Sequence, residues 1–228
     1  MAKKTGYIAF IAALAAISAG SSRALVNVGY CQAAPAATSA AVTRQVNEWP
    51  VTQEPARRLV EPGLPNFGKL NACLWRSGQP NQRGYQKLAE MHVKTIINLR
   101  EEYPQDKDQI PAGVQYFYIP IKDETAPTVE QAKEFLRIVS NPDNWPVLVH
   151  CRGGEGRAGV MCALVRHSFD GWDDKRIMKE VNNFRTAYLG FIRTRLKGSQ
   201  RQFLQEWEAN NKPGAYLSQL SVPQVSSM

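Results

Sequence analysis

The stretch that most restricts the fold of this chain is VLVHCRGGEGRAGV, residues 147–160. It opens with an apolar run typical of a buried strand, continues through a segment with four glycines, and closes on small and apolar residues that favour a helix. A strand, a glycine-rich turn and a helix in this order direct backbone N–H groups and the positive end of the helix toward one point. The stretch therefore predicts an anion site where the strand ends.

Strand and helix patterns alternate along most of the chain. β-branched or apolar runs predict strands within residues 71–80, 94–100, 114–121 and 145–151. Amphipathic spacing predicts helices at residues 81–93, 127–140, 158–169, 172–184 and 188–210, the last broken near Gly198. Thr128 and Gln131 form the pattern of a capping box. Because strands that alternate with helices form parallel sheets, we expect an α/β domain with a mainly parallel central sheet flanked by helices.

The chain starts with features of an export signal. Lys3 and Lys4 precede an apolar stretch of 14 residues, shorter than the roughly 20 that a membrane span needs. We expect an exported protein, periplasmic or secreted, or a membrane-anchored one if this segment is retained. The predicted segments are a signal or anchor at residues 1–24, a linker at 25–60, a folded domain at 61–211 and a flexible tail at 212–228.

The charge and the cysteine content restrict the kinds of partner and cofactor that we expect. The 228 residues carry a formal charge of +8, with a pI of about 9.4, which favours anionic partners such as nucleic acid, a membrane surface or phosphorylated substrates. The basic residues are scattered, with no run of five, so we expect no nucleic-acid partner. The four cysteines lack the paired CxxC spacing of metal sites, and we expect neither a metal nor a cofactor.

Cys151 and Arg157 stand at the two ends of the glycine segment. The field that binds an anion there also favours a thiolate over a thiol. The planar guanidinium of Arg157 suits two oxygens of one phosphoryl group. We therefore expect Cys151 to attack phosphorus and Arg157 to stabilise the charge. The phosphate-binding loop between them would consist of Arg152, Gly153, Gly154, Glu155 and Gly156, followed by Ala158.

The segment HCRGGEGR fits the pattern H-C-x-x-G-x-x-R and resembles the signature of the cysteine-dependent protein-tyrosine and dual-specificity phosphatase superfamily. The resemblance extends over residues 70–185, where WRSGQP, KTIINLR, NWPVLVHC and GWDDKRIMKEVNNF are similar to segments of the compact atypical dual-specificity phosphatases of plants, fungi and bacteria. It implies a protein-tyrosine-phosphatase-like fold and metal-free hydrolysis of phosphate monoesters through a phosphocysteine intermediate. Phosphotyrosine, and also phosphoserine or phosphothreonine, are the substrates that it implies.

The resemblance also implies a carboxylic acid that protonates the leaving oxygen from a loop upstream of the cysteine. Asp123 follows the strand at residues 114–121 and is the expected acid, with Glu124 as the neighbouring alternative. His150 is expected to orient the loop and tune the thiolate, and Arg76 to brace the loop from an adjacent strand end. Arg152 and Glu155, already placed in the loop, are expected at the pocket rim, where they bear on substrate choice.

Ala158 departs from the family pattern, which usually has Ser or Thr directly after the arginine. That hydroxyl assists departure of the thiolate, so its absence predicts slow breakdown of the phosphoenzyme. The resemblance further suggests that Cys73 forms a reversible disulfide with Cys151, since a second cysteine protects an oxidation-prone thiol.

Three other functions remain open at this point. An inositol polyphosphate or phosphoinositide phosphatase is favoured by Arg152 and the positive charge, and opposed by Glu155. A phosphate-binding module without turnover is suggested by Ala158 and opposed by the intact Cys151 and Arg157. A rhodanese-like sulfur-transfer loop also begins with Cys after a strand, but it is built differently and lacks the upstream acid.

Overall fold

The computed structural model describes residues 49–185, 187–188, 191–192 and 196–220. All of these residues belong to one compact unit of the chain. The signal or anchor predicted at residues 1–24 and most of the predicted linker lie outside the described residues and stay predictions. Within the described part of the chain, no helix has the length and apolar character needed to cross a membrane.

Six strands form one sheet in the order β1-β2-β3-β6-β4-β5. They are β1 (Leu59–Glu61), β2 (Leu64–Lys69), β3 (Leu74–Ser77), β4 (Thr95–Arg100), β5 (Gln115–Ile121) and β6 (Val147–His150). β3, β6, β4 and β5 run parallel, whereas β1 pairs antiparallel with β2, and β2 with β3. The sheet is therefore mixed: its centre has the predicted parallel arrangement, and the antiparallel β1 and β2 correct the prediction at one edge.

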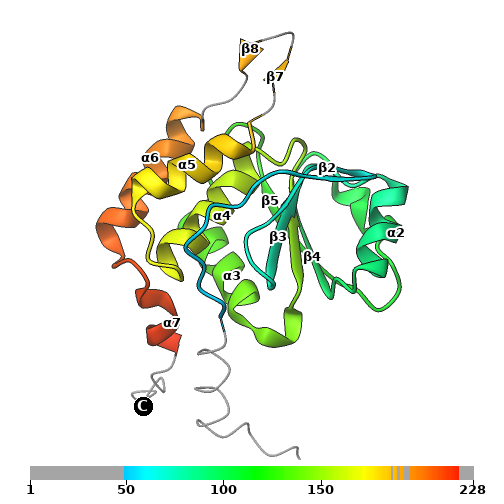
Figure 1. Ribbon diagram of the computed structural model, residues 1–228, viewed down its shortest axis with the longest axis horizontal. Helices are drawn as coiled ribbons and strands as arrows, with labels where there is room; N and C mark the ends of the chain where they lie inside the picture. Colours follow the sequence, from blue (N-terminus) through cyan, green and yellow to red (C-terminus); the bar gives the residue numbers. More distant parts are fainter. Residues whose placement is uncertain (1–48, 186, 189–190, 193–195, 221–228) are drawn as a thin grey trace, which may run out of the picture. The chain divides into compact units, whose positions relative to one another are not determined.

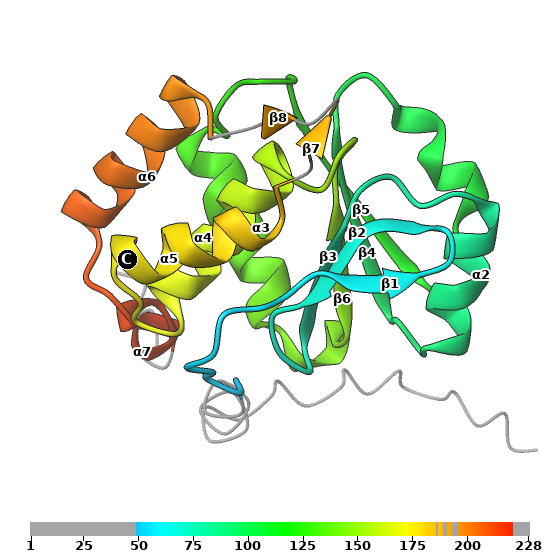
Figure 2. The same cartoon turned by 45° about the horizontal axis from the view of Figure 1, so that its top comes forward.

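Helices cover both faces of this sheet (Figures 1 and 2). α2 (Gln82–Glu90) packs on one face, and α3 (Val129–Ser140), α4 (Gly156–Ser168), α5 (Asp174–Asn183) and α6 (Gly198–Asn210) lie on the other. Neighbouring strand residues point to opposite faces: Ile97 and Val149 join the apolar cluster around α4, whereas Ile96 and Leu148 join the cluster around α2. Two short 3-10 helices, η1 (Pro104–Gln109) and η2 (Pro142–Asn144), complete the connections.

The start of α3 shows how local sequence sets these elements. The hydroxyl of Thr128 accepts a hydrogen bond from the backbone N–H of Gln131 at 3.2 Å, and the Gln131 side chain accepts one from the backbone N–H of Thr128 at 2.9 Å. The predicted capping box is therefore confirmed.

Residues 49–58 form a strap that packs on the domain, where the sequence predicted a linker. Trp49 is buried, and its Nε1 donates to Asp170 Oδ1 at 2.8 Å. The backbone N–H of Ala56, also buried, donates to Glu180 Oε2 at 2.7 Å. The predicted boundary at residue 61 thus falls inside the folded domain, because the strap sequence has no helical or strand periodicity that would reveal its anchoring residues.

The strap lies over a buried ionic cluster. The side chain of Arg166 has no exposed surface and pairs with Glu180 at 2.6 Å and with Asp170 at 2.5 Å. Its guanidinium also stacks on the Trp172 ring at 4.2 Å. Burial raises the pKa of Asp170, although Arg166 and Trp49 oppose that effect. The cluster uses α4, α5 and the strap together, so it ties the strap to the helices.

The C-terminal part differs from its prediction in two places. Instead of a helix from residue 188, β7 (Ala187–Tyr188) and β8 (Phe191–Ile192) pair antiparallel, and α6 starts at Gly198, where the sequence predicted a break. α7 (Ala215–Leu220) then packs Tyr216 and Leu217 against the core, where a loose tail was predicted from Lys212.

Candidate active site

The predicted anion site is a loop between the end of β6 and the start of α4, which we call the phosphate loop (residues 151–157). Cys151 is buried, and its Sγ accepts a hydrogen bond from the backbone N–H of Gly154 at 3.2 Å. No side-chain hydrogen bond caps the N-terminus of α4 among the described residues. The N–H groups of the first helical turn therefore remain for an anion.

Gly154 fixes the shape of this loop. Its φ is +71°, and a Cβ atom there would lie 2.5 Å from the backbone N of Gly78 and 2.6 Å from the carbonyl carbon of Ser77. Only glycine combines this φ with so close an approach. The loop thus packs directly against the turn after β3 at Gly154. Arg152 and Gly153, just before it, are exposed to solvent.

Arg76 on β3 holds the loop from below. It is buried, and its Nη2 donates to the carbonyl of Gly154 at 2.6 Å, while its guanidinium lies 4.0 Å from the centre of the Phe184 ring. Asn66 binds the carbonyl of the preceding loop residue: its Nδ2 donates to Gly153 O at 3.1 Å and also to Phe184 O at 2.9 Å. The loop carbonyls are thereby turned toward the protein.

Arg157 is held by an acid that the sequence analysis did not single out. Its Nη1 and Nη2 donate to the two carboxylate oxygens of Glu102 at 2.7 and 3.0 Å, and Nη1 also donates to the carbonyl of Ile121 at 3.0 Å. Hydrogen bonds from Arg157 are the largest cause that lowers the pKa of Glu102, to about 2. Burial alone would lower the pKa of Arg157, but Glu102 and nearby anionic groups raise it.

The contact with Glu102 leaves one edge of the guanidinium available. Among the described residues, none accepts a hydrogen bond from Nε of Arg157. Glu102 binds the edge formed by the two terminal nitrogens. A guanidinium has a second edge, formed by Nε and one terminal nitrogen, whose donors suit two phosphate oxygens.

Asp123 lies next to this edge, on the loop after β5. Its Oδ1 is 3.2 Å from Nη2 of Arg157, and its side chain is 56% exposed. The structure therefore brings Asp123 next to Arg157, at a position open to solvent.

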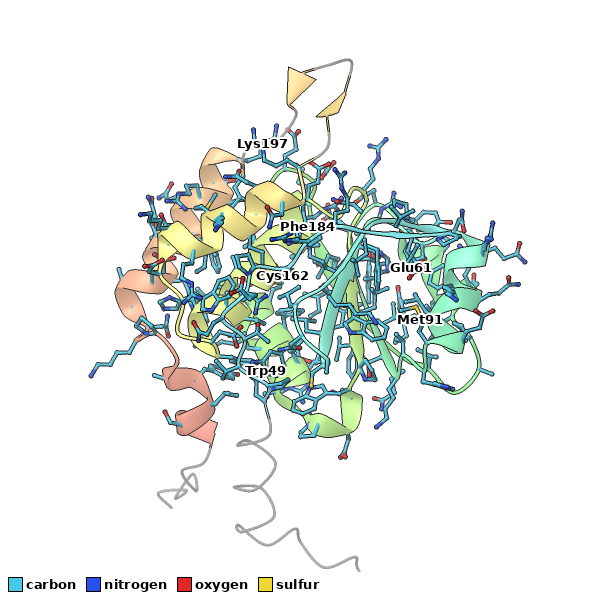
Figure 3. All side chains as sticks on the ribbon, in the orientation of Figure 1. Trp49, Glu61, Met91, Cys162, Phe184 and Lys197 are labelled. Carbon is cyan, nitrogen blue, oxygen red and sulfur yellow. The ribbon has the colours of Figure 1, made fainter. Side chains whose placement is uncertain are left out.

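Glu124 is directed elsewhere: its carboxylate pairs with Lys197 Nζ at 2.8 Å, at the start of α6 (Figure 3). Of the two acids, Asp123 is the one that contacts Arg157.

A buried polar chain lies behind the cysteine. Nε2 of His150 is 2.8 Å from Oδ2 of Asp106, and both side chains have no exposed surface. Asp106 also accepts hydrogen bonds from the Tyr85 hydroxyl and, at 2.7 Å, from Gln79 Nε2. Burial would raise the pKa of Asp106, but the contacts with His150, Tyr85 and Gln79 lower it overall. This anion orients His150, and the sequence analysis did not identify it.

The remaining loop residues have separate positions. Glu155 and Gly156 are half-buried, and a Cβ on Gly156 would lie 3.2 Å from the Gln200 side chain. Ala158 has no exposed surface and lies in the first turn of α4. In the described residues, no group of three or more His, Cys, Asp and Glu side chains has a metal-binding arrangement.

The predicted Cys73–Cys151 disulfide is wrong for this fold. Cys73 precedes Leu74, which pairs with Val147, whereas Cys151 follows His150, which pairs with Ser77 at the other end of β3. The two cysteines are thus five residues apart along parallel strands, or roughly 16 Å, while a disulfide requires Cα atoms within about 7 Å. Both are free, and burial raises the pKa of Cys73 to about 11.

Comparison with known proteins agrees with this geometry. The sequence model of a family described as "DSP-PTPase phosphatase fused to NAD+ Kinase" matches residues 65–194. The chain is 27% identical over 158 residues to the "Putative tyrosine-protein phosphatase OCA1" of Debaryomyces hansenii, covering 64% of this chain and 79% of that protein. It is 28% identical over 153 residues to the "Inositol diphosphatase DSP4" of Arabidopsis thaliana, covering 64% and 73%.

Solved structures give the same fold. The catalytic domain of the PP-IP phosphatase SIW14 from S. cerevisiae superposes with a TM-score of 0.54 at 27% identity, covering 64% of this chain and 87% of that one. TpbA from P. aeruginosa has a TM-score of 0.55 at 22% identity, covering 75% and 97%, and supports the fold alone. The family match spans more than half of the chain, and the chain therefore belongs to the family of dual-specificity and tyrosine phosphatases of the cysteine-dependent type.

Proposed function

We propose that this phosphatase hydrolyses phosphotyrosine in proteins through a phosphocysteine intermediate, with Cys151 as nucleophile, Arg157 as phosphate clamp and Asp123 as general acid. The observation that carries the proposal is the common position of the three groups. Arg157 contacts Asp123 at 3.2 Å, and Sγ of Cys151 lies at the start of the loop that ends in Arg157.

The steps follow from these positions. The thiolate of Cys151 attacks phosphorus, the P–S bond forms and the P–O ester bond breaks, while Asp123 gives its proton to the leaving oxygen. Arg157 and the loop N–H groups stabilise the charge on the phosphoryl oxygens. Water then attacks phosphorus, Asp123 accepts its proton, and the thiolate of Cys151 leaves. His150, held by Asp106, orients the loop, and Arg76 braces it.

A second candidate substrate is an inositol polyphosphate. It is supported by the printed names of two relatives, an inositol diphosphatase and a PP-IP phosphatase, and by the exposed Arg152 at the mouth of the loop. A polyanion gains more from that arginine than an isolated phosphotyrosine does.

A turnover panel tests both candidates. Purified protein is assayed with phosphotyrosine and phosphoserine peptides and with inositol polyphosphates, beside the variant Cys151→Ser. We expect many equivalents of phosphate per protein from the phosphotyrosine peptide and none from the variant. Release of one equivalent or less from every substrate would identify a phosphate-binding module instead, and preferential turnover of inositol polyphosphates would favour the second candidate.

A further inference from the structure

A basic pocket lies between the strap and α5, outside the catalytic groups. Its volume is about 400 Å³, and its walls are Glu54, Pro55, Arg57, Arg58, Lys179 and Asn183. The strap runs beside α5 in both ribbon views (Figures 1 and 2). Asn183 joins the two, because its Nδ2 donates to the carbonyl of Ala56 at 2.8 Å.

The cations of this pocket have no partner within the part of the chain that the structure describes. Arg57, Arg58 and Lys179 are exposed, and none of them forms an ion pair or side-chain hydrogen bond with a described residue. Glu54 is the single carboxylate among the lining residues. Several other arginines are tied to carboxylates, as Arg137 is to Glu134 at 2.7 Å. Three unpaired cations around one hollow create a positive potential that attracts an anion.

The pocket is close to the phosphate loop. Asn183 is followed by Phe184, whose carbonyl and that of Gly153 both bind Asn66 Nδ2, at 2.9 and 3.1 Å. Since consecutive Cα atoms are 3.8 Å apart, Asn183 lies within roughly 12 Å of the Gly153 carbonyl. Phe184, labelled in Figure 3, marks this junction between α5 and the loop. An extended peptide covers such a distance with about four residues.

We propose that the basic pocket binds a second anionic group of the substrate, a phosphate or carboxylate, while Arg157 holds the phosphate that is hydrolysed. The proposal rests on the phosphatase function above and narrows its substrate to polyanions. The planar guanidinium groups of Arg57 and Arg58 bind such oxygens in pairs, and Lys179 adds a third charge. The second group comes either from an acidic or phosphorylated side chain several residues from the phosphotyrosine, or from a polyphosphorylated small molecule.

The test removes the three charges and compares substrates. The variant Arg57→Gln/Arg58→Gln/Lys179→Gln is assayed with p-nitrophenyl phosphate, with inositol hexakisphosphate, and with phosphotyrosine peptides flanked by glutamates or by glutamines. We expect kcat/KM to fall about tenfold, mainly through KM, for the glutamate peptide or for inositol hexakisphosphate. The values for p-nitrophenyl phosphate and the glutamine peptide stay within twofold. The substrate that loses rate identifies the source of the anion.

A matched control variant removes three positive charges from other parts of the surface. Lys94, Lys133 and Lys212 are exposed and outside the pocket, and their triple replacement by Gln changes every rate less than twofold. An equal loss in both triple variants would show a general charge effect and overturn the proposal, as would unchanged kcat/KM for every polyanion. If the unaltered protein fails to hydrolyse p-nitrophenyl phosphate, the proposed catalytic function is wrong instead.

Discussion

Replacing Glu102 with Gln tests whether this acid holds the phosphate clamp. The carboxylate accepts from both terminal nitrogens of Arg157, at 2.7 and 3.0 Å, and the Arg157 side chain is only 1% exposed. An amide retains one acceptor oxygen and loses the charge. We therefore expect Arg157 to lose its fixed orientation while Cys151 and the loop backbone stay in place.

The magnitude follows from the pKa of Glu102, which folding lowers from 4.5 to about 2. That difference corresponds to about 3 kcal/mol in favour of the ionised form. Because the side chain is 40% exposed, solvent screening reduces the contribution to about 1–2 kcal/mol. If the same energy is lost from phosphate binding in the transition state, kcat/KM falls about 5- to 30-fold.

The pH dependence has a definite sign. Because folding lowers the pKa of Glu102, the stabilisation is complete above about pH 4.5 and disappears as the pH falls toward about 2. Urea unfolding between pH 6 and pH 3 should therefore show a smaller loss of stability in Glu102→Gln than in the unaltered protein. The expected fall in kcat/KM is measured separately, by steady-state hydrolysis of p-nitrophenyl phosphate.

Glu101→Gln is the matched control, since Glu101 is exposed and its side chain forms no hydrogen bond or ion pair with Arg157 or any other described residue. If the two variants agree within twofold in kcat/KM and have the same acid unfolding curve, Glu102 does not hold Arg157 and the reasoning fails.

Three further changes test other parts of the structure. Asp123→Asn should lower kcat about 100-fold for a phosphotyrosine peptide and less for p-nitrophenyl phosphate, whose leaving group needs little protonation; equal effects on both substrates would exclude Asp123 as the acid. Ala158→Ser should raise the steady rate that follows a rapid burst of product, and linear progress curves of equal slope in both proteins would contradict slow phosphoenzyme breakdown. Arg166→Met leaves Asp170 and Glu180 buried without their cation and should lower the free energy of unfolding by about 3–5 kcal/mol; a loss below about 1 kcal/mol in urea titration would show that the cluster does not stabilise the strap.

The parts of the fold that sequence reasoning predicted are those with strong local patterns. The capping box at Thr128 and the apolar runs of β4, β5 and β6 need no information from elsewhere in the chain. The strap shows the opposite case, because Trp49 and Ala56 are buried by partners on α4 and α5 more than a hundred residues later. β1 and β2 were missed for a different reason: β1 has only three residues, and β2 contains Pro65 and Gly68, which weaken the pattern of a strand.

The residues of the candidate site show the same difference between local patterns and contacts to distant parts of the chain. Cys151 and Arg157 belong to one contiguous loop, so their spacing alone brings them together. Asp106, in contrast, meets His150 only because η1 brings it within 2.8 Å of that side chain, and a solitary Asp in a polar loop gives no local signal. The proposed pairing of Cys73 with Cys151 failed because spacing along the chain does not say which end of a parallel strand a residue occupies.

Sheet topology explains how Glu102 could have been found. Parallel strands end at one edge of a sheet, and the residues that follow them gather there. Arg100 at the end of β4 pairs with Ile121 at the end of β5, so Glu102 and Asp123, each two residues further on, reach the same level. Cys151 follows β6 at this edge too, between the strands that deliver the other two groups and β3. The resemblance implied an acid on the loop after a strand, which indicated Asp123, and the same description applies equally to Glu102. The two acids differ in what they contact: Glu102 binds both terminal nitrogens of Arg157, whereas Asp123 is more exposed and is the acid that we propose to exchange a proton with the substrate.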